Sequence, residues 1–255
     1  MTAHYAVPAM GATQAHGSRS DRYGFVPTSQ LISGLQEHGW ALSTANQVHS
    51  RTADKRSSAK HLLRFRRPDA LADTPELIMI NSHDGSSQYQ LRVGYFRFAC
   101  ANGLIVGEDI FPGLHVRHDQ HAMENVIEGT YRVLEDFPAL VDRVGGLKAI
   151  QLSDTERWAF ARRALPLRFD LLDEKTGAYP VIADQLLVPR RREDVGTDLW
   201  STFNVIQENL IRGKLRGRLT NGQRRSTRPI RGIDQNVKIN QALWSLAEEM
   251  RRLKA

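Results

Sequence analysis

The sequence contains a single cysteine, Cys100, among its 255 residues. One thiol can neither close an intramolecular disulfide nor supply a multi-cysteine metal site, which excludes a disulfide-stapled secreted domain and a zinc ribbon. No stretch approaches the roughly 20 apolar residues of a membrane-spanning helix, and residues 1–20 lack the continuous apolar core of a signal peptide. We therefore expect a cytoplasmic protein with no membrane partner.

Nucleotide-binding motifs are missing as well. The sequence has no Walker-type loop and no glycine-rich dinucleotide fingerprint, so ATP or NAD chemistry has no support and we expect no cofactor. What the chain does have is 41% hydrophobic residues beside 25% charged residues, a balance typical of folded globular proteins and not of disordered or fibrous ones. Its length allows one or two domains.

Positive charge is concentrated in one short segment. The formal net charge is +7, and residues 212–231 hold eight Arg or Lys and no acid, which leaves −1 for the rest of the chain. Arginine outnumbers lysine seven to one in this segment, and a guanidinium fork can bind two oxygens of one phosphate. The candidate phosphate contacts are Arg212, Lys214, Arg216, Arg218, Arg224, Arg225, Arg228 and Arg231.

Secondary-structure periodicity fails in the same segment. Gly213, Gly217, Gly222 and Pro229 interrupt it, so we expect a mobile, exposed basic loop that two helices hold at its ends. A solvated surface without any partner is the alternative explanation of such a charge run.

Strand patterns dominate the first half of the chain. Residues 61–67, 76–80 and 88–100 alternate or run apolar as strands do, and shorter runs follow at 104–106 and 114–116. At Gly94 the apolar phase slips, which predicts a β-bulge. We expect a curved antiparallel sheet over about residues 58–118.

Helical periodicity dominates about residues 120–255. An amphipathic helix begins near Met123, and Gly145 and Gly146 are expected to end it, while the sequence Ser-Asp-Thr-Glu from Ser153 has the form of a capping box. Strands followed by helices indicate an α+β fold, with the sheet packed on helices. We expect one domain over residues 21–255, preceded by a disordered segment over residues 1–20.

Two constellations could carry catalysis or bind a metal. The sequence NSHDGSS at residues 81–87 contains Ser82, His83 and Asp84, but adjacent side chains diverge, so a turn in which Asp84 and Ser86 cap backbone amides is favoured over a ligand site. A second group could form a metal cluster, with surface histidines as the alternative. Its members are His115, His118, His121, Glu108, Asp109 and Asp119. Their spacing matches no strong metal motif, so we expect no metal site.

The predicted strands also carry arginine. Arg64, Arg66, Arg92 and Arg97 are expected to line a polar, basic face of the sheet, because Gln88 and Gln90 have the parity opposite to the apolar series. Such a groove suits sequence-tolerant binding of a single strand, although strand aromatics are core residues more often than stacking platforms.

Four sequence blocks resemble a family of unknown function. They are DRYGFVPT from Asp21, INSHDGSSQYQL from Ile80, FRFACANGLIVG from Phe96, and the stretch from Asp198 to Trp244 that includes RPIRGIDQNVKINQALW. The family is the phage/plasmid-like domain-of-unknown-function family of prophages, plasmids and integrative elements, and the resemblance covers about residues 21–250. It implies a bacterial cytosolic protein of mobile DNA and carries no catalytic residues over to this chain.

These observations rank three hypotheses. The first is a non-enzymatic protein that binds single-stranded DNA without sequence preference and promotes annealing as a homo-oligomer, because the expected sheet and helix are similar in architecture to single-strand annealing proteins. The second is an interaction protein that modulates a host DNA-processing or defence system. The third is a metal-dependent nuclease that uses His83 and Asp84 or the three spaced histidines.

Overall fold

The chain forms two compact units. The computed structural model describes residues 7–50, 52–69, 73–97, 100–108, 111–218 and 221–254, without the side chains of residues 100–102. Unit 1 comprises Met1–Phe98 and Gly103–Pro138, and unit 2 comprises Ala99–Asn102 and Ala139–Ala255. The sequence predicted one domain over residues 21–255, and the structure groups these residues into two compact units.

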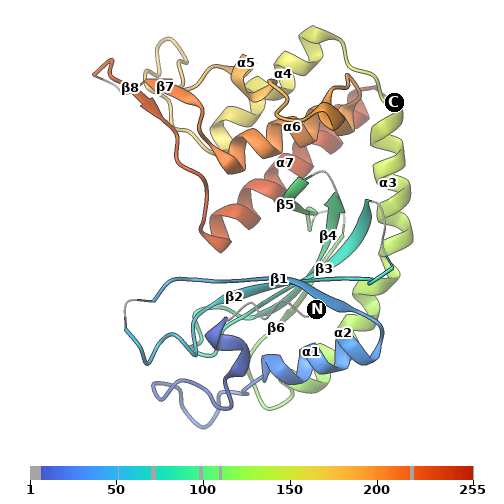
Figure 1. The fold of residues 1–255 in the computed structure, drawn as a ribbon, viewed down its shortest axis with the longest axis vertical. Coiled ribbons are helices and arrows are strands. Elements are labelled where there is room, and N and C mark those ends of the chain that lie inside the picture. The colour runs from blue at the N-terminus through green and yellow to red at the C-terminus, as the bar shows by residue number, and fades with distance from the viewer. Residues whose placement is uncertain are drawn as a thin grey trace. The chain divides into compact units, whose positions relative to one another are not determined.

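Unit 1 is built on an antiparallel sheet (Figure 1). The strands β1 (Ala41–Gln47), β2 (His61–Arg66), β3 (Thr74–Asn81), β4 (Tyr89–Arg97) and β5 (Cys100–Ile105) lie in chain order, and β6 (Leu114–Val116) pairs with β4. Every pairing whose register is described is antiparallel. This sheet and the helices around it confirm the α+β fold.

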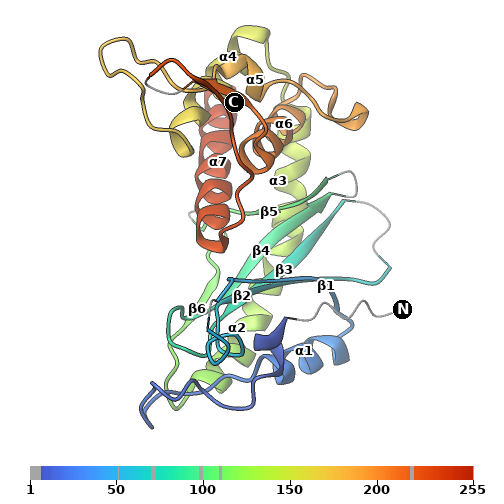
Figure 2. The same cartoon turned by 60° about the vertical axis from the view of Figure 1, so that its left-hand side comes forward.

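Two helices cover one face of the sheet. Helices α1 (Thr28–Glu37) and α2 (Ala122–Glu135) lie beside each other on that face in both ribbon views (Figures 1 and 2). Leu31 of α1 and Val126 of α2 are buried against strand residues such as Met79, which is fully buried. Apolar side chains at helical spacing and at alternate strand positions thus form the core of unit 1.

Two details of the sheet differ from the prediction. Strand β1 lies before residue 58, where the sheet was expected to start. The prediction missed it because its sequence ALSTANQ has no apolar alternation. The register of β3 with β4 runs through Gly94 without a bulge, and the irregularity lies between Leu42 and Thr44 of β1 instead. A Cβ at Gly94 would lie 2.5 Å from Ile78 Cδ1 and 2.8 Å from the Leu104 carbonyl oxygen, so glycine is needed there for close strand packing.

The N-terminal stretch is part of unit 1. A short 3-10 turn, η1 (Pro8–Gly11), places Ala9 at 0% exposure. The Ala9 amide donates to Gln47 Oε1 at 3.0 Å, and its carbonyl accepts from His83 Nε2 at 3.0 Å. The prediction of disorder over residues 1–20 is therefore wrong for residues 7–20, and residues 1–6 lie outside the described part.

Unit 2 is largely helical (Figure 2). Its helices are α3 (Phe137–Ala149, which begins at the last two residues of unit 1), α4 (Asp154–Ala164), α5 (Ala183–Leu186), α6 (Leu199–Arg212) and α7 (Ile233–Lys254), with short turns η2 (Leu165–Leu167) and η3 (Arg192–Asp194). Phe160, Phe203 and Trp244 are among its fully buried side chains. The strands β7 (Arg216–Arg218) and β8 (Arg224–Ser226) form a separate two-stranded sheet.

Helix boundaries in unit 2 follow the sequence in part. Ser153 Oγ accepts from the Glu156 amide, and the Glu156 carboxylate accepts from the Ser153 amide at 2.7 Å, which confirms the capping box. Gly145 and Gly146 lie inside α3, so the prediction that they end a helix is wrong.

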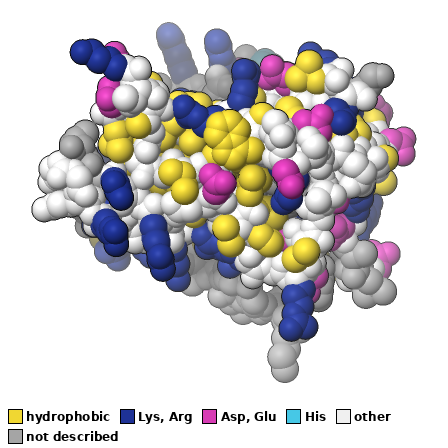
Figure 3. All heavy atoms as spheres, turned by 90° about the horizontal axis from the view of Figure 1, so that it is seen from above, with side chains coloured by type: hydrophobic (Ala, Val, Ile, Leu, Met, Phe, Trp, Pro, Cys, Tyr) yellow, Lys and Arg dark blue, Asp and Glu magenta, His cyan; other side chains and the backbone are white. Residues whose placement is uncertain are grey.

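No helix in the described part of the chain is both long and apolar enough to cross a membrane. Figure 3 shows hydrophobic side chains gathered on the face seen above α4 and α5, with Lys and Arg side chains around them.

Candidate nucleic-acid interface

The basic segment forms a β-hairpin. Arg216 pairs with Ser226, Gly217 with Arg225, and Arg218 with Arg224. The prediction of a segment without strand structure is therefore wrong, although residues 219–220 lie outside the description. A strand-like arrangement gives each arginine a defined side of the hairpin, which a loop would not.

Gly213 allows the chain to leave α6 and enter the hairpin. Its φ is +63°, and a Cβ there would lie 2.5 Å from the Arg228 carbonyl oxygen. Its amide donates to the Asn209 carbonyl at 3.2 Å. Any residue but glycine would strain the backbone and displace the segment that follows β8.

Two arginines outside the segment hold the root of the hairpin. The Arg168 guanidinium donates to the Leu210 and Arg228 carbonyl oxygens, and the Arg190 guanidinium donates to the Gly213 carbonyl and, at 2.7 Å, to Asn209 Oδ1. Burial lowers the pKa of both arginines. Their role is to position the strands that begin and end the hairpin.

The edge of β7 that does not pair with β8 is hydrogen-bonded to Pro180, which precedes α5, and to Gln185 of α5. The Arg218 amide donates to the Pro180 carbonyl at 2.9 Å. The Gln185 side chain donates to the Arg216 carbonyl and accepts from the Arg216 amide, each at 2.8 Å. The strand therefore has partners on both sides, with β8 on one and the stretch around α5 on the other.

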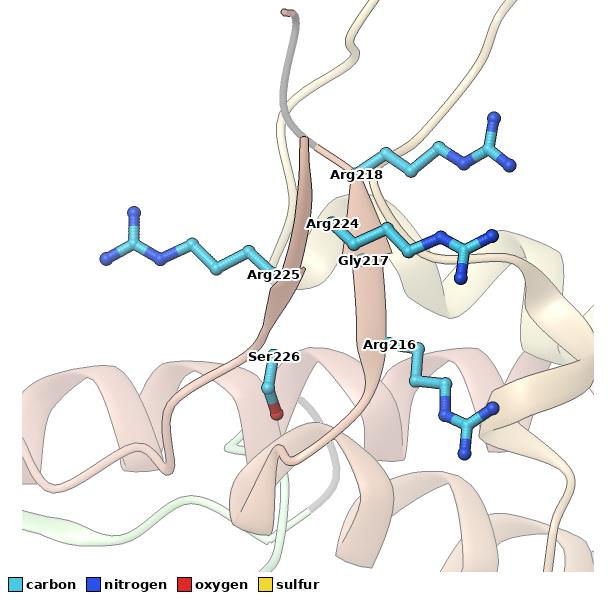
Figure 4. A pocket seen from close by; sticks show the side chains of 6 residues that line it. All are labelled: Arg216, Gly217, Arg218, Arg224, Arg225 and Ser226. Atoms are coloured by element: carbon cyan, nitrogen blue, oxygen red, sulfur yellow. The ribbon is translucent and has the colours of Figure 1, made fainter. Parts of the chain in front are cut away.

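Three arginines share one side of the hairpin. Figure 4 shows Arg216, Arg218 and Arg224 pointing to the same side and Arg225 pointing to the opposite one. These residues, with Gly217 and Ser226, line an open hollow of about 430 Å³. Alternate positions of one strand and a cross-strand partner thus bring three guanidinium groups together.

The hairpin cations are exposed, and no carboxylate among the described residues neutralises them. Among the described residues, none of the following has a carboxylate within ion-pair distance: Lys214, Arg216, Arg218, Arg224, Arg225, Arg228 and Arg231. Arg212 differs, because it lies in α6 and its Nε is 3.2 Å from Glu208 Oε1, which also accepts from Arg191 at 2.8 Å. We therefore withdraw Arg212 from the phosphate-binding set.

The sheet arginines do not form the expected basic groove. Arg64 and Arg92 lie in register across β2, β3 and β4, as strand parity predicted, but they are 8% and 6% exposed. Arg64 forms an ion pair with Glu76, and Arg92 with Glu108. Burial lowers the pKa of Arg92 to about 10. Their charge is neutralised inside unit 1, so the prediction of a free basic face is wrong.

The other two sheet arginines are also engaged. Arg97 is 8% exposed, and its Nε lies 3.7 Å from Asp73 Oδ2. The Arg66 guanidinium lies 3.6 Å from the centroid of the Phe96 ring, where it makes a cation–π contact.

The NSHDGSS segment is a structural turn with a buried histidine. Asp84 Oδ1 accepts from the Ser86 amide at 2.9 Å, as the turn interpretation predicts. His83 is 0% exposed, and its Nε2 lies 3.3 Å from Thr28 Oγ1, which is 2.8 Å from His61 Nε2. Burial lowers the pKa of both histidines to about 4. A buried His83 beside a capping Asp84 gives the nuclease hypothesis no open reaction site here.

The three spaced histidines diverge. His115 Nε2 is 2.7 Å from Glu108 Oε1, His118 stacks on Tyr23 with centroids 4.7 Å apart, and His121 precedes α2 near Glu124. Within the described ranges no group of three or more His, Cys, Asp or Glu is placed to hold a metal ion. Asp109 lies outside them.

Sequence reasoning missed the residues that build the hairpin root. Arg168, Arg190 and Gln185 are 26 or more residues before β7 and look like ordinary solvated side chains in the sequence. Their contacts with backbone carbonyls and amides arise only when the chain folds back, and no local pattern marks them.

Comparison with known proteins gives the family of the chain. Two curated proteins of Escherichia coli (strain K12), "UPF0380 protein YafZ" and "UPF0380 protein YfjQ", are each 41% identical over 246 residues, which is 96% of this chain and 88% of each relative. No solved structure matches the chain significantly. Residues 15–244, which include both the sheet of unit 1 and the arginine hairpin, match the domain of unknown function DUF932, and the chain therefore belongs to the DUF932 family.

Proposed function

We propose that this protein binds nucleic acid through its phosphates on the β7–β8 hairpin, without catalysis and with little sequence preference, and that single-stranded DNA is the preferred form. One observation carries the proposal: Arg216, Arg218 and Arg224 point to one side of the hairpin and have no carboxylate partner among the described residues. An arginine guanidinium binds two oxygens of one phosphate, so a row of arginines without carboxylate partners attracts the phosphate backbone of a nucleic acid.

The spacing of the arginines supports a linear polyanion. Arg216 and Arg218 are two residues apart on one strand, which places them about 7 Å apart along it. Arg224 faces Arg218 across the ladder. Each guanidinium can therefore hold a separate phosphate, and contacts of this kind fix a backbone without reading its bases.

A salt titration with a labelled single-stranded oligonucleotide tests the proposal. If the hairpin and its flanking cations hold about four phosphates, the logarithm of the affinity falls with the logarithm of the salt concentration with a slope of about −3. Affinity that does not change between about 50 and 200 mM salt would contradict phosphate binding.

A charge-matched pair of variants locates the interface. The triple variant Arg216→Ala, Arg218→Ala, Arg224→Ala should bring the slope to about −1, because three phosphate contacts are lost. The control is Arg117→Ala, Lys148→Ala, Arg252→Ala, which removes three exposed cations elsewhere. The two variants have the same net charge, so equal binding by both would show that overall charge, and not the hairpin, attracts DNA.

An acidic protein surface is the second candidate partner for the same hairpin. The same unpaired arginines would form ion pairs with carboxylates, and affinity for free DNA would be weak. A host protein that is captured stoichiometrically after nuclease treatment, and lost in the triple hairpin variant, would favour this candidate. Annealing activity and homo-oligomer formation stay predictions. Sedimentation with and without the oligonucleotide tests oligomer formation, and the rate at which two complementary strands form a duplex with and without the protein tests annealing.

A further inference from the structure

A second hollow lies close to the hairpin in unit 2 and is chemically different from it. It has a volume of about 540 Å³ and is lined by Asp154, Thr155, Arg157, Trp158, Asp184 and Leu187. Trp158 of α4 is 46% exposed, whereas the other three tryptophans, Trp40, Trp200 and Trp244, are at most 3% exposed. A large aromatic side chain in an open hollow is the kind of surface on which a nucleobase or another flat ring stacks.

Helix α5 connects this hollow to the hairpin. Asp184 and Leu187 line the hollow, and Gln185 between them makes the two 2.8 Å hydrogen bonds with the backbone of Arg216. Arg216 in turn lines the arginine hollow. Helix α5 therefore lines the hollow that contains Trp158 and is hydrogen-bonded to the strand that carries Arg216.

The two hollows differ in charge and therefore suit different parts of a nucleic acid. The hairpin hollow is lined by four arginines and no acid, so it suits phosphate. The Trp158 hollow contains two carboxylates, Asp154 and Asp184, which repel phosphate. Asp154 lies 3.4 Å from Arg157, and Asp184 is exposed. The second hollow, which holds one cation beside its two carboxylates, therefore suits an uncharged base better than a phosphate.

We propose that Trp158 is a stacking platform for an unpaired base of a strand whose phosphates lie on the arginine hairpin. The inference rests on the proposed function and specifies its substrate, because a base can reach the ring only when it is free of its partner strand. The carboxylates add a preference, since Asp accepts a hydrogen bond from an exocyclic amino group such as cytosine N4. Thymine has no such group.

Tryptophan fluorescence of the full chain gives a direct test. Because Trp158 is the exposed member of the four tryptophans, a base stacked on it quenches emission that the buried three do not lose. Oligo-dC should quench the emission, and a duplex of the same length should not. A strand that binds without any quenching would overturn the inference.

Substitution of Trp158 separates stacking from phosphate binding. Trp158→Leu should weaken binding of oligo-dC roughly 5- to 150-fold and leave the salt slope unchanged, because stacking releases no counterions. Trp158→Phe should retain most of the affinity. Ile182→Ser is the control, since Ile182 is 61% exposed and lies directly before α5, which lines the hollow, but has no ring to stack. An equal loss in this control would overturn stacking as the cause.

The outcomes also distinguish this inference from the proposed function. If Trp158→Leu binds as the wild type does while the triple hairpin variant does not, stacking is wrong and phosphate binding stands. If neither variant changes the affinity, both are wrong. Emission that changes with polyglutamate but not with the oligonucleotide would overturn stacking in favour of an acidic protein surface. Asp184→Ala, which has no acceptor, should reduce the preference for oligo-dC over oligo-dT, and an unchanged preference would contradict the role of the carboxylate.

Discussion

The Arg64–Glu76 ion pair shows how unit 1 accommodates charge inside its sheet. Glu76 is 1% exposed, and burial raises the pKa of its carboxyl while Arg64 opposes that rise. Arg64 also donates to the Gly103 carbonyl at 3.1 Å, which satisfies a second part of the guanidinium. Two charges taken out of water in this way depend on each other, because neither has solvent to replace its partner.

Removal of one partner should therefore cost more than removal of both. We expect Arg64→Met to lower the free energy of unfolding by about 3–5 kcal/mol and the double variant Arg64→Met, Glu76→Leu to recover much of that loss. Arg132→Met is the control, because the exposed Glu128–Arg132 pair contributes less than about 1 kcal/mol. Chemical denaturation of the four proteins measures these differences, and a double variant no more stable than Arg64→Met would contradict the coupling.

Single residues could be predicted from the sequence only in part. Strand parity correctly placed Arg64 and Arg92 on one side of the sheet, since side chains alternate along a strand. It could not reveal that Glu76 and Glu108 neutralise them, because those contacts depend on which strands are neighbours. The hairpin arginines were identified correctly as exposed, with Arg212 as the exception.

At the scale of elements, the hairpin depends on one glycine at its start. Gly213 combines a φ of +63° with a position where a Cβ would meet the Arg228 carbonyl at 2.5 Å. Gly146 is the opposite case, because it lies inside α3 and a Cβ there would meet nothing within 4 Å.

The two glycines should therefore respond to the same substitution with opposite signs. We expect Gly213→Ala to destabilise the protein by about 1–3 kcal/mol and to weaken oligonucleotide binding by displacing the arginines. Gly146→Ala should stabilise it by about 0.5–1 kcal/mol, because alanine loses less backbone entropy in a helix. Thermal unfolding and the salt titration measure both effects, and a stabilised Gly213→Ala protein would show that the turn is less constrained than its geometry implies.

Elements with strong periodicity or caps were predicted well, and those that depend on distant partners were not. Strands β2, β3 and β6 and the capping box of α4 match their sequence patterns. Strand β1 and the β7–β8 hairpin have weak local signals and form because β2 and the Pro180–Gln185 stretch offer them hydrogen-bond partners. Tertiary pairing overrides local propensity at such edges.

At the scale of the whole molecule, stability should depend on pH through the buried histidines. His61 Nδ1 is 3.0 Å from the Ala59 carbonyl and donates to it, so a neutral His61 leaves Nε2 to accept from the Thr28 hydroxyl. Protonation of His61 would place a second donor against that hydroxyl and a charge in a buried site. Burial accordingly lowers the pKa of His61 from its ordinary 6.5 to about 4.

The sign follows from this lowered pKa. The unfolded chain binds protons near pH 6.5 and the folded chain only near pH 4, so the stabilisation is fully present above about pH 6.5 and is lost as the pH falls toward 4. The loss is on the order of 3 kcal/mol for His61. Melting temperatures at pH 7 and pH 5 should therefore differ less in His61→Gln than in His49→Gln, whose histidine is exposed. Equal differences would contradict a neutral, buried His61.

The division into two units was not predictable from composition. The boundary falls inside α3 and within β5, where the sequence has no linker rich in Gly, Pro or Ser. The charge asymmetry was visible at once, because the whole positive excess lies in residues 212–231.

The first residues of the described chain have a practical consequence for anyone who prepares shorter versions of this protein. Ala9 and His16 are hydrogen-bonded to His83, and Tyr23 to the Ser82 carbonyl, so this stretch contacts the histidine that is fully buried in unit 1. A version that begins at Tyr23 would lose these contacts and expose His83 to water. Failure of such a version to bind a strand would report damage to the scaffold and say nothing about the arginines.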